Sequence, residues 1–210
     1  MNYLIDHDDA IRNLEPAFGD LPADPYTEGN FRFRRYSAFR YKGGVLDILP
    51  PETFTQSRRI NAYLGDVQRT YDPIDEATWR DPAFRRMLEH FDEHTLVDIG
   101  KHIGVHQIRI RKTGDAVMAP EGRHQDGFDR IAVYVVGREN LDGGNLRLSA
   151  NARDEPFIEA ALMPGDYVVI NDRALFHNAS PIERIDEDRD AFIDFFVATS
   201  MDDGKDRLVQ

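Results

Sequence analysis

Three His-x-Asp pairs are the residues of this sequence best suited to bind a metal ion: His7 with Asp9, His90 with Asp92, and His124 with Asp126. An imidazole nitrogen and a carboxylate oxygen two residues apart can share one ion only if both side chains leave the backbone on the same side. The local backbone expected at each pair therefore decides which pair can chelate.

Only the third pair is predicted to lie on extended backbone. It falls in PEGRHQDGFDR, residues 120–130, just before the apolar stretch DRIAVYVVG, which is typical of a buried strand. On extended chain, residues i and i+2 point to the same face. Gly122 and Gly127 would let the backbone turn closely around an ion held there. The sequence therefore predicts that His124 and Asp126 are two metal ligands.

The other two pairs are predicted not to chelate. His90 and Asp92 lie in a stripe of helical periodicity, and positions i and i+2 of a helix point roughly 200° apart. His7 and Asp9 lie near the N-terminus, at the start of a short helix expected around residues 8–18, where an aspartate is a candidate N-cap.

His177, in RALFHNASP after the strand-like stretch YVVIND, is the candidate third ligand. In a jelly roll, a strand some fifty residues further along the chain can lie beside the first. Two histidines and one carboxylate form the facial triad of non-haem Fe(II) oxygenases, which leaves coordination positions open for a co-substrate and oxygen. The alternative is that His177 is a surface polar residue whose hydrogen bonds are made to backbone.

Arg189 is the candidate anchor for a 2-oxoglutarate co-substrate. It begins RDAFIDFFVATS, about a dozen residues after His177, and an arginine can hold the distal carboxylate of 2-oxoglutarate with two parallel hydrogen bonds. Arg184 is the second choice, although Glu183 and Asp186 nearby suggest a solvated loop. The alternative for Arg189 is an ordinary salt bridge to a neighbouring aspartate.

The elements that must position these residues are mostly strands. FRFRRYSAFRY, VHQIRIRK and RDAFIDFFVATS alternate as strands do, and LDGGNLRLS carries a hairpin signal. Helices are expected between about residues 53 and 100, where FRRMLEHFDEHTLVDI has an apolar stripe. The fold predicted is mainly β with flanking helices around a double-stranded β-helix, which is a jelly-roll, cupin-like core.

The chain of 210 residues is predicted to be one domain, 1–210. Residues 1–100 would pack on a catalytic jelly roll of residues 101–200, and residues 201–210 would form a polar tail. The net charge of −12 argues against nucleic acid and acidic membrane surfaces as partners. The absence of cysteine excludes thiolate sites and fits a cytoplasmic protein, and no apolar run is long enough for a membrane helix. A homodimer is compatible with the sequence, which does not fix the oligomeric state.

These motifs resemble the bacterial 2-oxoglutarate/Fe(II)-dependent dioxygenases typified by L-isoleucine 4-hydroxylase. The resemblance rests on PEGxHxDG, a long apolar strand, a Gly-Gly turn, PGDxxxIxD with a later histidine, and an arginine before the last strand, and it covers about residues 31–200. It implies a double-stranded β-helix, the cofactors Fe(II), 2-oxoglutarate and O2, and hydroxylation of a free amino acid with release of succinate and CO2. The family's metal ligands fall on His124, Asp126 and His177, and its 2-oxoglutarate arginine falls on Arg189.

A free amino acid would need a cation for its carboxylate and an anion for its ammonium group. Arg35 and Arg123 are candidates for the first role, Glu121 for the second, and Gln107 and Gln56 for neutral hydrogen bonds. The alternative function is a cupin-like metal-binding protein or isomerase that does not use 2-oxoglutarate. Cupins usually combine a His-x-His pair with a later glutamate, and Arg189 would then have no role.

Overall fold

The computed structural model describes residues 1–42, 44–56, 58, 65–95, 102–114, 116, 118 and 122–201, and it is mainly β. The helices are the 3-10 helix η1 (Asp9–Phe18), α1 (Glu76–Trp79) and α2 (Pro82–Thr95). The strands are β1 (Tyr3–His7), β2 (Arg32–Lys42), β3 (Val45–Ile48), β4 (His102–Arg111), β5 (Ile131–Glu139), β6 (Leu141–Gly143), β7 (Leu146–Ser149), β8 (Ile158–Ala160), β9 (Asp166–Ile170), β10 (Phe176–Ala179), β11 (Ile182–Arg184) and β12 (Phe192–Met201).

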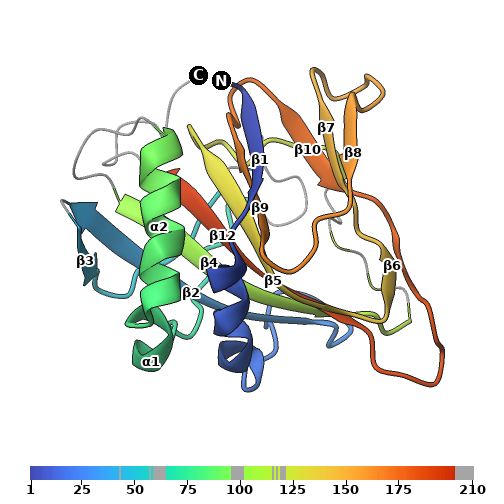
Figure 1. The fold of residues 1–210 in the computed structure, drawn as a ribbon, viewed down its shortest axis with the longest axis horizontal. Coiled ribbons are helices and arrows are strands. Elements are labelled where there is room, and N and C mark those ends of the chain that lie inside the picture. The colour runs from blue at the N-terminus through green and yellow to red at the C-terminus, as the bar shows by residue number, and fades with distance from the viewer. Residues whose placement is uncertain are drawn as a thin grey trace.

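Seven strands form a large antiparallel sheet in the order β1-β9-β5-β12-β4-β2-β3. The helices η1, α1 and α2 lie across one face of this sheet (Figure 1). The sheet order interleaves strands from both halves of the chain, so the first strands are built into the same sheet as the last one. The predicted division into an N-terminal part, residues 1–100, and a catalytic core, residues 101–200, stays a prediction.

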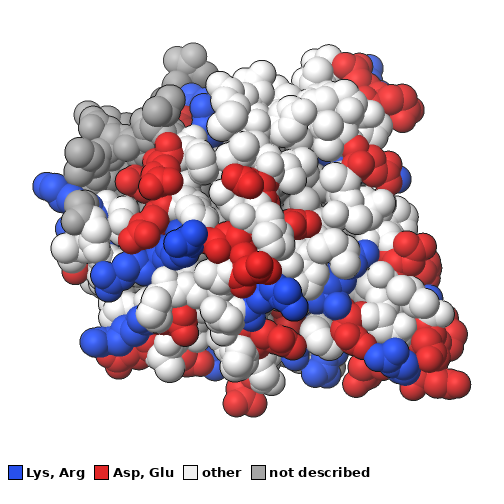
Figure 2. Space-filling view, viewed as in Figure 1, with Lys and Arg blue, Asp and Glu red and all other residues white. Residues whose placement is uncertain are grey.

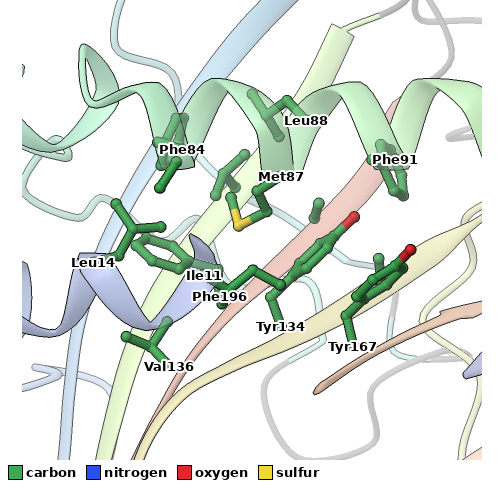
Figure 3. Close-up of a cluster of buried hydrophobic side chains, with 14 of the residues drawn as sticks. Ile11, Leu14, Phe84, Met87, Leu88, Phe91, Tyr134, Val136, Tyr167 and Phe196 are labelled. Carbon is green, nitrogen blue, oxygen red and sulfur yellow. The ribbon is translucent and has the colours of Figure 1, made fainter. Parts of the chain in front are cut away.

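The main core lies between the helices and the large sheet. Phe84, Met87, Leu88 and Phe91 of α2 are almost fully buried and, with Phe196 of β12, belong to one apolar cluster (Figure 3). These are the residues of the predicted helical stripe, so α2 confirms that prediction within the part of the stripe that the structure describes. The burial follows from their spacing of three and four residues, which places them on one side of a helix.

The opposite face of the large sheet belongs to the jelly roll. A smaller sheet in the order β10-β7-β8 and the pair β11-β6 complete the barrel. Figure 1 shows β7, β8 and β10 together, away from the helices. A second apolar cluster contains residues of both sheets, among them Val135, Leu148 and Phe195. The predicted jelly-roll core with flanking helices is confirmed.

Alternation along the strands decides which side chains face the barrel. On β12, Ile193, Phe195 and Val197 line a pocket inside it, whereas Phe196 packs under the helices. On β4, Ile108 lines the pocket and Val105 faces the helices. A shift of one residue would exchange the two faces, so the register of β12 fixes the pocket wall.

Two details of the predicted secondary structure are wrong. Residues 53–56 and 65–74 are not helical, because Phe54 and Arg69 pair as an antiparallel bridge. The Asp-Gly-Gly turn does not close a hairpin, because β6 pairs with β11 and β7 pairs with β8 and β10. At Gly143, φ is +75°, and a Cβ there would lie 1.8 Å from the carbonyl oxygen of Pro181. The turn therefore passes the chain from one sheet to another.

The surface carries both signs of charge. Figure 2 shows acidic and basic groups interspersed over the face covered by the helices. Among the described residues, no helix is long and apolar enough to cross a membrane. Most of the predicted tail, residues 202–210, lies outside the described residues.

Candidate metal centre and its pocket

His124, Asp126 and His177 come together at one end of the barrel. One ligand atom of each lies within 4.8 Å of the others. The Nε2 atom of His124 is 3.5 Å from one oxygen of the Asp126 carboxylate, and that of His177 is 3.5 Å from the other. Two imidazole nitrogens and one carboxylate are the donor set that non-haem Fe(II) sites use. The residues present therefore fit an Fe(II) ion.

Backbone pairing places the two histidines side by side. His124 and His177 form an antiparallel bridge, with reciprocal N–H to carbonyl hydrogen bonds of 3.0 and 2.9 Å. The Nδ1–H of His124 donates to the carbonyl oxygen of Gly122 at 2.9 Å. Because a carbonyl can only accept, Nδ1 carries the proton, and Nε2 of the neutral ring keeps its lone pair for a metal.

Asp172 holds the loop that carries the His-x-Asp pair. Its carboxylate is 1% exposed and accepts hydrogen bonds from the backbone N–H groups of Asp126 at 3.0 Å, Gly127 at 2.7 Å and Phe128 at 2.9 Å. One of its oxygens also lies 3.7 Å from the buried Nδ1 of His177. Asp172 thus contacts both chain segments that carry the three ligands and orients them, as carboxylates behind metal-bound histidines do.

The electrostatics of Asp126 favour the charged, ligand form of its carboxylate. Burial would raise the pKa of Asp126, but the hydrogen bonds and positive charge that His124 and His177 supply when protonated, without a metal, outweigh burial and hold this pKa well below its usual range. Gln56 adds a neutral contact, because its Nε2 lies 3.4 Å from a carboxylate oxygen and 3.2 Å from the backbone oxygen of Asp126.

The triad opens into a pocket that occupies the inside of the barrel. Much of its wall is apolar, and the residues of β5 and β12 that form it include Ile131, Val133, Val135, Ile193, Phe195 and Val197. Such a wall excludes water and strengthens electrostatic contacts made within the pocket.

One side of the pocket is strongly polar. Arg32 and Arg34 of β2, His106 of β4, and Asp24 and Arg69 from loops line it together. These five residues are called the arginine chamber below. Gln56 connects the chamber to the metal site, because its Oε1 accepts a hydrogen bond of 3.0 Å from Arg69 while its Nε2 contacts Asp126.

Arg189 is not brought to this pocket. Its side chain is 60% exposed and forms an ion pair with Glu139, because the residues before Phe192 form a turn outside the barrel. Arg184, the second choice, donates to the backbone oxygen of Lys112 at 2.9 and 3.0 Å. The predicted role of Arg189 in binding 2-oxoglutarate therefore stays a prediction, which this placement does not support.

The candidate substrate residues are also dispersed. Arg35 lies on the helix side of β2, 3.0 Å from Asp75, and Gln107 donates to the backbone oxygen of Ala17 of η1 at 2.9 Å. Arg123 turns toward the backbone oxygens of residues 152 and 154. None of Arg35, Gln107 and Arg123 lines the described pocket, and Glu121 lies outside the described residues. Their contacts with substrate stay predictions.

The other two His-x-Asp pairs do not form a metal site. His90 and Asp92 lie in α2, as predicted. His7 contacts Asp9 at 3.2 Å through Nε2 and Asp166 at 2.7 Å through Nδ1, so the two carboxylates lie at opposite nitrogens of the ring. Asp8, rather than Asp9, caps the 3-10 helix. Among the described residues, only His124, Asp126 and His177 form a potential metal-binding group.

Comparisons with known proteins agree with the site. A family model described as 2OG-Fe dioxygenase matches residues 15–199. The chain is 26% identical to the 3(1)-hydroxy-L-isoleucine 4-dioxygenase of Pantoea ananatis over 186 residues, which are 83% of this chain and 74% of that protein. Among solved structures, it is similar to a bsmA homolog from Methylobium petroleophilum, with a TM-score of 0.79 and 26% identity over 91% of this chain and 80% of the other. It also resembles IDO from Bacillus thuringiensis in fold, with a TM-score of 0.78 and 17% identity over 94% of this chain and 92% of the other.

Proposed function

The chain belongs to the 2OG-Fe dioxygenase family and is a non-haem iron dioxygenase that uses Fe(II), 2-oxoglutarate and O2, and we propose that it hydroxylates a free L-amino acid with release of succinate and CO2. The observation that carries the proposal is the convergence of His124, Asp126 and His177 on one pocket inside the barrel. The relative from Pantoea ananatis, whose name describes an amino-acid dioxygenase, supports the substrate class. We also propose a cytoplasmic location and a homodimeric assembly.

Different residues of this chain would bind the iron, orient its ligands and exclude water. His124, Asp126 and His177 would hold the iron, which supplies the oxidative decarboxylation of 2-oxoglutarate and the oxidation of the substrate. Asp172 orients the loop that carries two of these ligands, and Gln56 fixes the Asp126 carboxylate. The apolar walls from β5 and β12 exclude water from the reacting groups.

The function is tested first by spectroscopy. Anaerobic protein with Fe(II) and 2-oxoglutarate is expected to show the weak visible charge-transfer band of a chelated keto acid. His124→Ala and His177→Ala should each remove this band, because each loses an iron ligand. If both variants keep the band, the triad is wrong.

The amino-acid proposal is tested separately by a screen of the common L-amino acids with 2-oxoglutarate and O2. A substrate is expected to increase succinate formation and to yield a product heavier by one oxygen atom. Full iron and 2-oxoglutarate binding without any amino-acid product would retain the dioxygenase and reject the substrate class. A protein that binds iron but never consumes 2-oxoglutarate would instead favour the cupin-like alternative.

For the distal carboxylate of 2-oxoglutarate, we keep Arg189 as the proposed anchor. Its exposed ion pair with Glu139 is of a kind worth only about 0.2–1 kcal/mol, so a carboxylate ligand could replace Glu139 at little cost. Arg189→Gln is expected to raise the Kd for 2-oxoglutarate by roughly tenfold or more, because it removes a charged hydrogen bond. Titration of the charge-transfer band measures this Kd, and Arg184→Gln, the comparison variant, should change it far less.

Arg138 is the competing anchor, because one nitrogen of its guanidinium group lies next to a pocket-lining glycine and has no hydrogen-bond partner among the described residues. Its Nη1 is buried with no hydrogen-bond partner among the described residues and would lie 3.7 Å from a Cβ built on the pocket-lining Gly144. Its Nη2, however, donates to the backbone oxygens of Leu141 and Gly143 and so already supports that turn. A larger rise in Kd for Arg138→Gln than for Arg189→Gln would move the anchor to Arg138.

A further inference from the structure

The arginine chamber contains buried donors without acceptors. The Nε of Arg69 and the Nε2 of His106 are buried and have no hydrogen-bond partner among the described residues, although both residues are only 3% exposed and line the pocket. The Nε of Arg32 is also buried and has no hydrogen-bond partner among the described residues. The carboxylate of Asp24 lies 4.0 Å from it. Buried polar groups without partners are rare, and each needs an explanation.

The tautomer of His106 makes its unpartnered atom a donor as well. The Nε–H of Arg34 donates to Nδ1 of His106 at 3.1 Å, so Nδ1 carries no proton. Burial and the charges of the three arginines hold the pKa of His106 well below its usual range, so the ring is neutral with its proton on Nε2. All three unpartnered atoms therefore require an acceptor.

Positive charges outnumber negative charges among the described residues of the arginine chamber. Among the described residues, Asp24 is the only carboxylate within 4.0 Å of the chamber arginines, at 3.8 Å from Arg34 and 4.0 Å from Arg32, and none lies that close to Arg69. Burial lowers the pKa of Arg34 to about 10, which still leaves it charged at neutral pH. Three guanidinium groups against one carboxylate leave two positive charges uncompensated, and buried charges are normally paired.

Aromatic packing holds two of the arginines, Arg34 and Arg69, in place. The guanidinium of Arg69 lies over the ring of Phe54 at 4.7 Å, and that of Arg34 lies over the ring of Tyr71 at 4.6 Å. Aromatic stacking holds a guanidinium plane while leaving its edge free to donate. A ligand would find these donors already oriented, which lowers the entropy cost of binding.

We propose that the arginine chamber binds a carboxylate group of the substrate, with Arg69 and His106 as its direct donors and Arg32 and Arg34 as supporting charges. This assignment rests on the proposed function, because it takes the pocket to be the oxygenase site. It places the substrate carboxylate beside Gln56, which contacts both Arg69 and Asp126. Of the β2 arginines, Arg32 and Arg34 would then contribute to substrate selection, whereas Arg35 lies on the other side of the strand.

The test compares ligands that lack either the carboxylate or the amino group. The probes are the common L-amino acids, their amides, and the corresponding carboxylic acids without the amino group. Binding is measured as the change in melting temperature of the metal-free protein and as the perturbation of the anaerobic charge-transfer band. Wild type is expected to bind at least one carboxylate, and the matching amide roughly 10- to 100-fold more weakly, as for loss of a charged hydrogen bond.

The variants are Arg69→Gln, Arg69→Lys and, as the control, Arg40→Gln, which changes an exposed arginine of β2, the strand that carries Arg32 and Arg34. Arg69→Gln should weaken carboxylate binding by roughly 10- to 100-fold, and Arg69→Lys by less, because it keeps the charge but loses the planar fork. Arg40→Gln should bind as wild type does. The Kd for 2-oxoglutarate should stay unchanged in all three variants.

Several results would overturn the assignment. They are amides that bind wild type as tightly as carboxylates, an absence of any carboxylate binding to wild type, or a folded Arg69→Gln that binds carboxylates normally. A rise in the Kd for 2-oxoglutarate alone would assign the chamber to the co-substrate instead. Circular dichroism checks the fold, and if Arg69→Gln fails to fold, Arg69→Lys and the amide comparison decide.

Binding of carboxylic acids but of no amino acid would keep the chamber and reject the amino-acid proposal, whereas a missing charge-transfer band would reject the dioxygenase function independently.

Discussion

Asp172→Asn is expected to weaken Fe(II) binding by roughly 10- to 100-fold, the effect typical of removing a partner that orients metal ligands. The carboxylate of Asp172 accepts three backbone N–H groups from residues 126–128 and lies 3.7 Å from Nδ1 of His177. An amide has one acceptor oxygen, and its NH2 group would face backbone donors. The loop that carries Asp126 would therefore lose its fixed position relative to His177.

The measurement is a titration of the metal-free variant with Fe(II) under anaerobic conditions, in parallel with the 2-oxoglutarate charge-transfer band. Asp188→Asn, at an exposed position in the loop before β12, is the matched control and should behave as wild type. A normal iron affinity in a folded Asp172→Asn protein would show that the three N–H contacts do not position the ligands. Loss of folding would be visible by circular dichroism, and Asp172→Glu would then test whether a carboxylate restores binding.

The triad could be predicted because its evidence is local. The periodicity around His124 and Asp126 indicated extended backbone before a buried strand. On extended backbone, residues i and i+2 point to the same face, so the two side chains could be predicted to share an ion. His177 needed a fold hypothesis as well, since its position beside His124 depends on the pairing of segments more than fifty residues apart. The jelly-roll prediction supplied that pairing.

The residues that support the site were less accessible to prediction. Asp172 stands in the strand-end sequence YVVIND, and a carboxylate directly after a buried strand is a signal, but its partners are backbone atoms of another segment. Alternation on β2 separated Arg34 from Arg35 without showing which face meets the pocket. That choice depends on the helices, which cover the side that carries Arg35 and leave Arg34 to the pocket.

Arg189, in the loop before β12, illustrates the same limit. Its distance along the chain from His177 suits an anchor at the start of a strand, yet β12 begins only at Phe192 and the side chain pairs with Glu139. Strand boundaries depend on hydrogen bonding with neighbouring strands, which sequence periodicity locates only to within a few residues. The direction of a side chain near a strand end is correspondingly hard to predict.

A buried ion pair joins β12, a strand of the pocket wall, to its neighbour β4. Asp194 of β12 is fully buried and receives two hydrogen bonds of 2.6 Å from Arg109, which lies directly opposite it on β4. The ring of Phe192 lies 4.4 Å from the guanidinium of Arg109. Removing one partner of a buried pair leaves a charge without compensation, so Asp194→Ala is expected to lower the free energy of unfolding by about 3–5 kcal/mol.

Urea unfolding followed by circular dichroism measures this change, and a double variant separates the charge from the packing. Asp194→Leu combined with Arg109→Met removes both charges and should recover much of the lost stability, since apolar residues of similar volume can replace a buried pair. Equal destabilisation by the single and double variants would show that the pair contributes through shape rather than charge. Because Ile193 and Phe195 flank Asp194 and line the pocket, a weakened register at this position should also raise the Km of any substrate identified by the screen.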